Sequence, residues 1–423
     1  MQRLEELPCM RTFTVRDGCL SLSGRPVPEL VAEAGGTPVY LYDEAMLQTR
    51  LAELRGALPG DVAVHYAVKA NPMPALLQCL ADRVDGFDIA SAGELERLLA
   101  IGVAPDRISF AGPGKRDDEL AAAIAAGITL HIESAGELER VAELATRSEA
   151  RPRVALRINP NFELKRSGMR MAGGPQPFGI DAECAPQLLQ RMDALPVAFQ
   201  GFHLFAGSQN LRTDLLIEAL DPMFRLLGDL AAQAPEPVRQ VTLGAGLGIP
   251  YFPGDQPVDL PAYARALATC LAQRPKSLQG TRIALELGRY LVGEAGVYIT
   301  RVIDRKISRG QVYLITDGGM HHHLAASGNL GQVVRRNFPV AVANRMDAPA
   351  QETATVVGPL CTPLDRLAEQ VELPTAGPGD LIAVFQSGAY GLTASPVHFL
   401  SHPLPRERLI PSNKEGSGHG HTR

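Results

Sequence analysis

An apolar, strand-like segment of the sequence, VAVHYAVKANP, ends in a lysine, Lys69. Side chains on a strand alternate between its two faces. Four side chains are therefore predicted to share one face: Ala63, His65, Ala67 and Lys69. A lysine amine shielded from water has a lowered pKa and can condense with an aldehyde. Lys69 is thus a candidate attachment point for an aldehyde cofactor, with a surface lysine at a strand end as the structural alternative.

A glycine-rich turn, LGAGLGIPYF, follows the strand-like segment QVTL. Gly244, Gly246 and Gly248 would let backbone N–H groups approach a phosphate closely. The turn is not a dinucleotide-binding fingerprint, because Ile249 and Pro250 stand where that pattern needs a glycine that opens a helix. We therefore predict a phosphate cradle, and a glycine turn without a ligand is the alternative.

Two further segments place polar side chains at strand ends. IALELGRYL contains Glu286 and Arg289, and a carboxylate there could keep a pyridine nitrogen protonated, which makes such a ring an electron sink. An internal ion pair is the alternative. GFHLFAGSQN adds His203, whose ring could stack on a planar cofactor, and Ser208, a candidate phosphate ligand. A structural histidine is the alternative for His203.

The segment MHHHLAAS invites interpretation as a metal site. On a strand only His321 and His323 would share a face, and no nearby acids complete the ligand set of a barrel metallohydrolase. No metal is therefore expected.

The elements that must position these residues alternate between strand-like and helix-like patterns from Thr37 onward. Nine strand candidates cover residues 38–43, 62–70, 84–90, 107–112, 128–133, 153–160, 199–207, 240–246 and 282–288. About eight βα units in roughly 250 residues predict an α/β fold, a closed (β/α)8 TIM barrel. Lys69 would follow its second strand.

The pattern becomes mostly β after about residue 290, and the short N-terminal strands are expected to join this second, mostly β domain. The predicted divisions are N-terminal strands (1–36), a cofactor-binding barrel (37–289), a C-terminal β domain (290–411) and a polar, glycine-rich disordered tail (412–423).

Charge and cysteine content limit the partners. The net charge of −5 is spread along the chain, so neither nucleic acid nor a membrane surface is an expected partner. No apolar stretch is long enough for a membrane span or an export signal. The six cysteines lack C-x-x-C spacing: Cys9, Cys19, Cys79, Cys184, Cys270 and Cys361. These features indicate a cytoplasmic enzyme acting on small molecules.

Eight motifs in chain order, spread over most of the chain, resemble the alanine-racemase-fold (fold type III) decarboxylases of diaminopimelate, ornithine and arginine, which use pyridoxal 5'-phosphate (PLP). The motifs are YAVKANP, FDIASAGEL, RINP, FHLFAGSQ, GAGLG, ELGRY, GPLCTPLD and SGAYG. The resemblance implies that Lys69 forms a Schiff base with PLP, His203 stacks on the ring and Glu286 pairs with the pyridine nitrogen. It also implies that Cys361 of the partner subunit returns a proton to the carbanion after CO2 leaves, which requires a homodimer with shared active sites.

The remaining implied contacts fall into two groups. Cofactor contacts are expected from Asp88, Ser208, Gly244, Gly246, Gly248, Gly288, Arg289 and Tyr390. Substrate contacts are expected from Arg157, Thr362, Asp365, His321 and His322.

Two motifs depart from the diaminopimelate enzymes, in which the cysteine is followed by Glu-Ser and the late strand ends in Glu-Pro-Gly-Arg. Here Thr362 and Pro363 follow Cys361, and Leu287 follows Glu286. The segments DGGMHHHLAAS, GPLCTPLDRL and SGAYGLTASPVHFLSHP resemble instead the butirosin-pathway glutamyl-carrier-protein and exosortase-A-associated decarboxylases. The subgroup implies a carrier-bound aminoacyl group or an unusual free amino acid as substrate. Diaminopimelate or ornithine/arginine decarboxylation, racemisation on the same fold, a non-catalytic regulatory homologue and a metal-dependent hydrolase are the alternatives.

Overall fold

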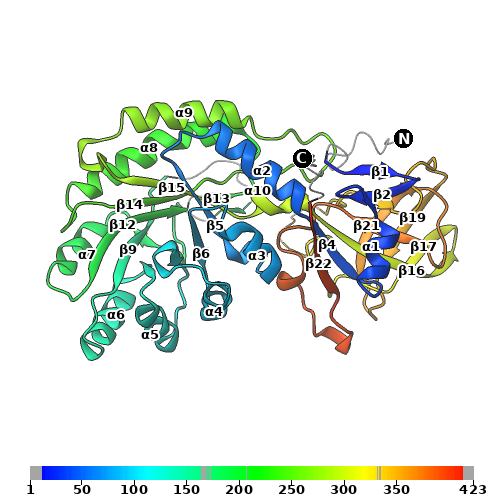
Figure 1. The fold of residues 1–423 in the computed structure, drawn as a ribbon, viewed down its shortest axis with the longest axis horizontal. Helices are drawn as coiled ribbons and strands as arrows, with labels where there is room; N and C mark the ends of the chain where they lie inside the picture. Colours follow the sequence, from blue (N-terminus) through cyan, green and yellow to red (C-terminus); the bar gives the residue numbers. More distant parts are fainter. Residues whose placement is uncertain are drawn as a thin grey trace, which may run out of the picture. The chain divides into compact units, whose positions relative to one another are not determined.

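The computed structural model describes residues 12–412 except 163–168, 171–172, 206, 331 and 333–334. The chain forms two compact units (Figure 1). The first comprises residues 1–50, 250–255 and 292–423, and the second comprises 51–249 and 256–291. Cys9 and the predicted disordered tail, apart from Ser412, lie outside the described residues, and the predicted domain boundaries stay predictions.

Eight parallel strands form a closed barrel in the second unit, in the chain order β5-β6-β7-β8-β9-β12-β14-β15, and β15 pairs with β5. The strands are β5 (Ala63–Ala67), β6 (Gly86–Ile89), β7 (Ile108–Phe110), β8 (Thr129–Ile132), β9 (Arg153–Asn159), β12 (Ala198–Phe205), β14 (Gln240–Gly244) and β15 (Arg282–Leu287). Short additions are β10 (Met169–Arg170), β11 (Ile180–Asp181) and β13 (Gly207–Ser208). This confirms the predicted barrel.

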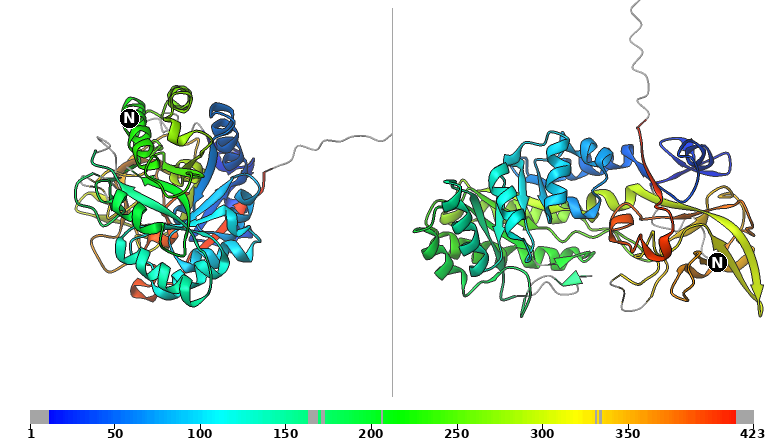
Figure 2. Two further views of the ribbon diagram at one scale, coloured as in Figure 1. Left: turned by 90° about the vertical axis from the view of Figure 1, so that its left-hand side faces the viewer. Right: turned by 90° about the horizontal axis from the view of Figure 1, so that it is seen from below.

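A helix follows each barrel strand, and Figure 2 shows the helices around the strands. They are α3 (Pro74–Ala81), α4 (Ala92–Ala100), α5 (Asp117–Ala126), α6 (Ala135–Arg147), α7 (Ala185–Met192), α8 (Thr213–Ala231), α9 (Leu260–Ala272) and α10 (Arg289–Val292). Parallel strands joined by helices bring all their carboxyl ends to one mouth of the barrel.

The first unit is mostly β, as predicted. Its strands are β1 (Thr14–Arg16), β2 (Cys19–Leu22), β3 (Arg25–Pro26), β4 (Val39–Asp43), β16 (Gly296–Ser308), β17 (Gln311–Thr316), β18 (Val340–Val342), β19 (Glu352–Val357), β20 (Arg366–Leu373), β21 (Leu381–Val384) and β22 (Arg406–Ile410). They include a sheet path β18-β21-β16-β17-β19-β20, and β4 pairs with β16 and β22. Helix α1 (Val27–Glu33) precedes β4, and α2 (Glu44–Ala57) leads from β4 toward the barrel.

A core of apolar side chains binds the β domain's strands and α1 together. Its members include Phe13, Leu20, Leu22, Leu30, Val39, Leu41, Val297, Ile299, Ala341, Leu381, Phe385 and Ile410. None of the helices described has both the length and the apolar character needed to cross a membrane.

One predicted barrel strand is wrong. Residues 38–43 contain β4, which runs antiparallel to β16 and parallel to β22 in the β domain. Every residue of β4 is buried, so its sequence has the continuous apolar character also expected of a parallel barrel strand. Lys69 therefore follows the first barrel strand rather than the second.

Candidate active site

Lys69 lies just beyond the carboxyl end of β5, in a 3-10 turn over Val68–Ala70 rather than on the strand itself. Its side chain is 41% exposed, and its Nζ lies 3.2 Å from Oε1 of Glu286. The Nζ also lies 5.1 Å from the centre of the Phe205 ring. A Cβ at Gly288 would stand 3.0 Å from that of Ala70, so a glycine there lets the ends of β15 and β5 pack closely.

Glu286 is the centre of the polar contacts in the barrel. Its Oε2 lies 2.9 Å from Nε2 of His203, and both side chains are buried. Burial raises the pKa of Glu286, but Lys69, the hydrogen bond with His203 and the charge of Arg157 outweigh it and hold that pKa well below the ordinary value. Glu286 is therefore a carboxylate at neutral pH.

A second histidine, His131 on β8, was missed by the sequence reasoning. Its ring stacks on that of His203, with centroids 4.5 Å apart and planes 27° apart. Burial, then the neighbouring His203, hold the pKa of His131 well below its ordinary value, so the ring is neutral. The alternation that was applied to Lys69 would also have turned His131 into the barrel.

The glycine turn packs against the segment that follows β12. A Cβ at Gly244 would lie 2.0 Å from the Phe205 ring, and one at Gly248 would lie 3.0 Å from the backbone of Gln209. Gly246 has a φ of +70°, which favours glycine. Packing alone thus accounts for part of the glycine content. Among the described residues, the amides of Gly246 and Leu247 have no acceptor, whereas the amide of Gly248 donates to Asn210 O at 3.0 Å.

Other predicted residues lie around the barrel interior. Asp88 on β6 is buried, accepts from the Ser109 hydroxyl and lies 3.4 Å from Nδ1 of His65. Arg157 on β9 pairs with Glu133 at 2.7 Å, and both side chains are buried.

Two predicted residues stand at strand ends. Ser208 is half-buried in β13, and Arg289 opens α10 directly after β15.

The remaining predicted residues belong to the first unit. Cys361 is an exposed free thiol, and Thr362 beside it is half-buried. Tyr390 is half-buried and has a φ of 53°. Asp365 is buried, and its two oxygens accept from the amides of Met320 and Leu360.

The three consecutive histidines lie in the turn after β17, not on a strand, and all are buried. The ring of His322 lies 3.2 Å from Tyr298 Oη and 2.9 Å from Pro403 O. His323 contacts Ser387 Oγ at 2.8 Å. Burial above all lowers the pKa of His321 to about 3, and neither of its ring nitrogens has a partner among the described residues. His321 is therefore neutral.

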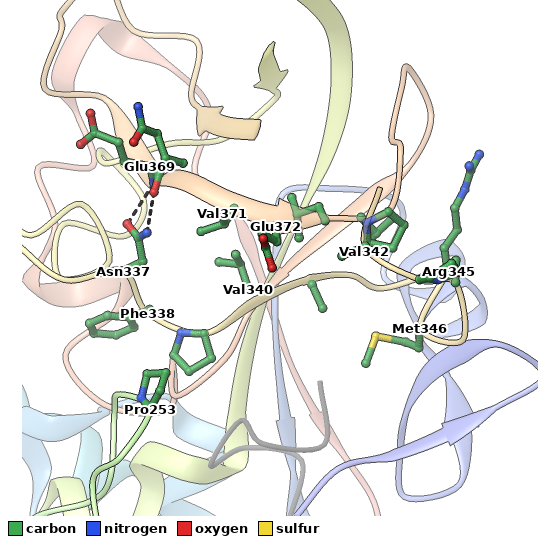
Figure 3. A pocket seen from close by; sticks show the side chains of 18 of the residues that line it. Pro253, Asn337, Phe338, Val340, Val342, Arg345, Met346, Glu369, Val371 and Glu372 are labelled. Carbon is green, nitrogen blue, oxygen red and sulfur yellow. Dashed lines mark hydrogen bonds between the residues drawn. The ribbon is translucent and has the colours of Figure 1, made fainter. Parts of the chain in front are cut away.

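A groove of about 1100 Å³ in the first unit lies at the facing edges of β18 and β20 (Figure 3). None of the predicted site residues lines it. The Asn337 carboxamide donates to Glu369 O at 2.7 Å and accepts from Glu369 N at 2.9 Å. The side chain of Asn337 thus pairs with the backbone of Glu369 as a residue of a neighbouring strand would. No group of three metal-ligating side chains that could hold an ion occurs among the residues described.

Comparisons with known proteins place this geometry in a family. Residues 44–293 match the pyridoxal-binding domain of pyridoxal-dependent decarboxylases. The chain is 38% identical to the L-glutamyl-[BtrI acyl-carrier protein] decarboxylase of Niallia circulans, over 88% of each chain. It is 32% identical to the diaminopimelate decarboxylase of Zymomonas mobilis, over 96% of this chain and 94% of that one. The crystal structure of the Helicobacter pylori diaminopimelate decarboxylase with L-lysine matches with a TM-score of 0.79 and 28% identity, over 91% of this chain and 94% of that one.

The chain belongs to the pyridoxal-dependent decarboxylases. The predicted family, the PLP cofactor and decarboxylation as the reaction are thereby confirmed.

The donor set in the barrel fits PLP. An amine, a carboxylate and an imidazole meet at Lys69, Glu286 and His203, and Nδ1 of the buried His203 has no partner among the described residues. The amides of Gly246 and Leu247 offer donors of the kind that a phosphate accepts.

Proposed function

We propose that this enzyme decarboxylates an aminoacyl group carried on a protein, or an unusual free amino acid, with Lys69 as the residue that holds PLP. The observation that carries the proposal is the arrangement of Lys69, Glu286 and His203, joined by distances of 3.2 and 2.9 Å at the mouth of the barrel. An attachment lysine must lie near the group that would bind the ring of the cofactor, and Lys69 lies beside the buried Glu286.

Each group has its own task in the proposed reaction. When bound, PLP supplies a protonated pyridine ring that accepts the electrons left on the α-carbon as CO2 departs. Glu286, charged at neutral pH, would hold the proton on the ring nitrogen, and His203 would stack on the ring while its hydrogen bond orients Glu286. Ser208, the amides around Gly246, the Arg289 guanidinium and Tyr390 would hold the phosphate.

Cys361 is proposed to return the proton to the α-carbon from the partner subunit of a homodimer. Its exposed thiol supports this role.

The substrate class rests on the relatives and on the residues after Cys361. The Niallia circulans relative is named for a glutamyl group on an acyl-carrier protein. Thr362 and Pro363 replace the Glu-Ser of the diaminopimelate enzymes, which removes the carboxylate expected to pair with a distal ammonium group. A screen that measures CO2 release from L-glutamate, meso-diaminopimelate, L-ornithine, L-arginine and glutamyl-loaded carrier protein tests the proposal. We expect the fastest release from the carrier-bound group. Fastest turnover of diaminopimelate would overturn the substrate class, and racemised substrate without CO2 would overturn decarboxylation.

We also infer that the enzyme works in the cytoplasm. The cysteines among the described residues are all free thiols, which supports a reducing compartment.

A further inference from the structure

Two loops of the β domain meet at one buried carboxylate. The first loop, residues 317–323, follows β17 and carries the three histidines, and the second, residues 358–365, follows β19 and carries Cys361. The strands β17 and β19 are parallel neighbours, so both loops leave the same edge of the sheet. Asp365 ends the second loop, and its side chain is 2% exposed.

The carboxylate of Asp365 divides its oxygens between the two loops. Oδ1 accepts from the Met320 amide at 2.6 Å, and Oδ2 accepts from the Leu360 amide at 2.8 Å. The backbone of Asp365 also accepts from the Gly358 amide at 3.1 Å. One side chain therefore ties together backbone positions 40 residues apart in the sequence.

Two glycines make room for this carboxylate. A Cβ at Gly319 would stand 2.2 Å from Oδ1, and one at Gly358 would stand 2.4 Å from Oδ2. Neither glycine has a positive φ, so space and not backbone conformation requires them. The close fit leaves the carboxylate little freedom to turn toward another ligand.

Beyond the buried Leu360, the tip of the Cys361 loop is mostly exposed. Cys361, Pro363 and Leu364 are exposed, and Thr362 is half-buried. Within the loop, the amide of Thr362 donates to Leu360 O at 2.8 Å, the Thr362 hydroxyl accepts from the Leu364 amide, and the Asp365 amide donates to Thr362 O at 3.3 Å. From β20, the amide and side chain of Arg366 donate to Leu364 O at 2.8 Å and to Pro363 O at 3.0 Å. The side chain of Asp365 thus links this loop to the histidine loop, while Arg366 links it to β20.

We infer that Asp365 is a positioning residue, not a substrate ligand: it clamps the Cys361 loop to the histidine loop and so sets where the Cys361 thiol lies. The inference rests on the proposed role of Cys361 as proton donor. A carboxylate whose oxygens both accept from backbone amides is occupied by the protein itself, which argues against the substrate contact expected from the sequence.

Amide hydrogen exchange followed by mass spectrometry tests the clamp directly. In the wild-type enzyme, the amides of Met320 and Leu360 should exchange at similar rates, because both are released by one opening. In Asp365→Asn, both should exchange about 10- to 100-fold faster, because the carboxamide NH2 group cannot accept from one of the two amides and the remaining oxygen, no longer charged, accepts more weakly from the other. Iodoacetamide should also alkylate Cys361 at a changed rate.

Asp380→Asn is the matched control. Asp380 is also a buried aspartate of the β domain, 6% exposed, and accepts from the Gly377 amide at 2.9 Å. Its substitution should speed exchange at Gly377 and leave Met320 and Leu360 unchanged. A variant in which only one loop responds, or neither, would overturn the clamp. If the Met320 and Leu360 amides of the wild-type enzyme exchanged at clearly different rates, the clamp would also be overturned, and this result does not require Asp365→Asn to fold.

The clamp and the proposed function fail in different ways. Turnover of Cys361→Ala at the wild-type rate with the same product would remove the proton-donor role, while joint exchange of the two loops would still support the clamp. If Cys361 is the donor and Asp365 positions it, Asp365→Asn should lower kcat with the absorption band of bound PLP unchanged. Unchanged kcat in Asp365→Asn would overturn its effect on Cys361.

Discussion

Replacing Glu286 with Gln keeps the volume of the side chain but removes its charge. Glu286 Oε2 lies 2.9 Å from His203 Nε2, and both groups are buried. A hydrogen bond to a charged group contributes about 1.5–3 kcal/mol. The 3.2 Å contact with Lys69 adds less, because that side chain is 41% exposed and solvent screens the pair. Since each 1.36 kcal/mol is a factor of ten, kcat/KM should fall about 10- to 150-fold.

The assay measures CO2 release together with the absorption spectrum of bound PLP, which should shift as the charge near the ring is lost. Asp85→Asn is the control, because Asp85 accepts from the Val64 amide at 2.7 Å at the start of β5, away from the strand end beside Lys69. It should leave the spectrum unchanged. Wild-type kcat/KM and an unchanged spectrum in Glu286→Gln would refute the assignment of Glu286 to the ring nitrogen.

Four further substitutions give separate tests. Lys69→Ala should abolish both the absorption band of bound PLP and turnover, and retention of either would contradict its role. Cys361→Ala should keep the band but slow or misdirect protonation of the α-carbon, measured as the rate and as deuterium stereochemistry in heavy water. For Asp85, burial raises the pKa, but the Val64 amide and the Arg55 and Arg282 guanidinium groups outweigh it and lower the pKa, so its stabilisation is present above the unfolded value and is lost as pH falls through the folded one. Urea unfolding should show Asp85→Asn about 0.5–1 kcal/mol less stable at pH 7, a difference that should shrink toward pH 3. Asn337→Ala should lower the free energy of unfolding by about 1–2 kcal/mol, since the backbone N–H and C=O of Glu369 lose their partners, and an unchanged urea midpoint would contradict this.

The convergence of Lys69, His203 and Glu286 could be predicted from the sequence. All three lie at or near the ends of strand-like segments that alternate with helices, and parallel strands in a barrel end at one mouth. Strand alternation gives the face of His203 and Glu286, which lie on β12 and β15, whereas for Lys69 it gives only the strand end at which the residue lies. Lys69 lies in a 3-10 turn of three residues just after β5, so the path of the backbone departs from the predicted strand only over this turn.

Contacts across the barrel could not be predicted in the same way. His131 on β8 and His203 on β12 are separated by β9, so their ring stacking depends on the curvature of the closed sheet. The membership of β4 in the β domain also depends on its pairing with β16, and the residues of β16 that pair with β4 lie about 250 positions later in the chain. Asp365 illustrates a third limit, since an aspartate that binds its own backbone and one that binds substrate look alike in a sequence.

Two other buried cations, Lys115 and Arg157, could compete with Lys69 for the carboxylate of Glu286, but each is paired with a different carboxylate. Lys115 is buried and donates to Glu137, and Arg157 is buried and pairs with Glu133 at 2.7 Å. Burial is the largest influence on the Lys115 amine and lowers its pKa, yet Glu137 at hydrogen-bond distance favours its charged form.

Each of these buried cations thus has its own carboxylate. Among the described residues, Glu286 forms ion pairs with Lys69 and His203, and the charge of Arg157 also lowers its pKa. A buried ion pair broken on one side leaves an uncompensated charge. The Lys115–Glu137 and Arg157–Glu133 pairs therefore leave Glu286 without a direct ion pair to either cation, although the charge of Arg157 still lowers its pKa.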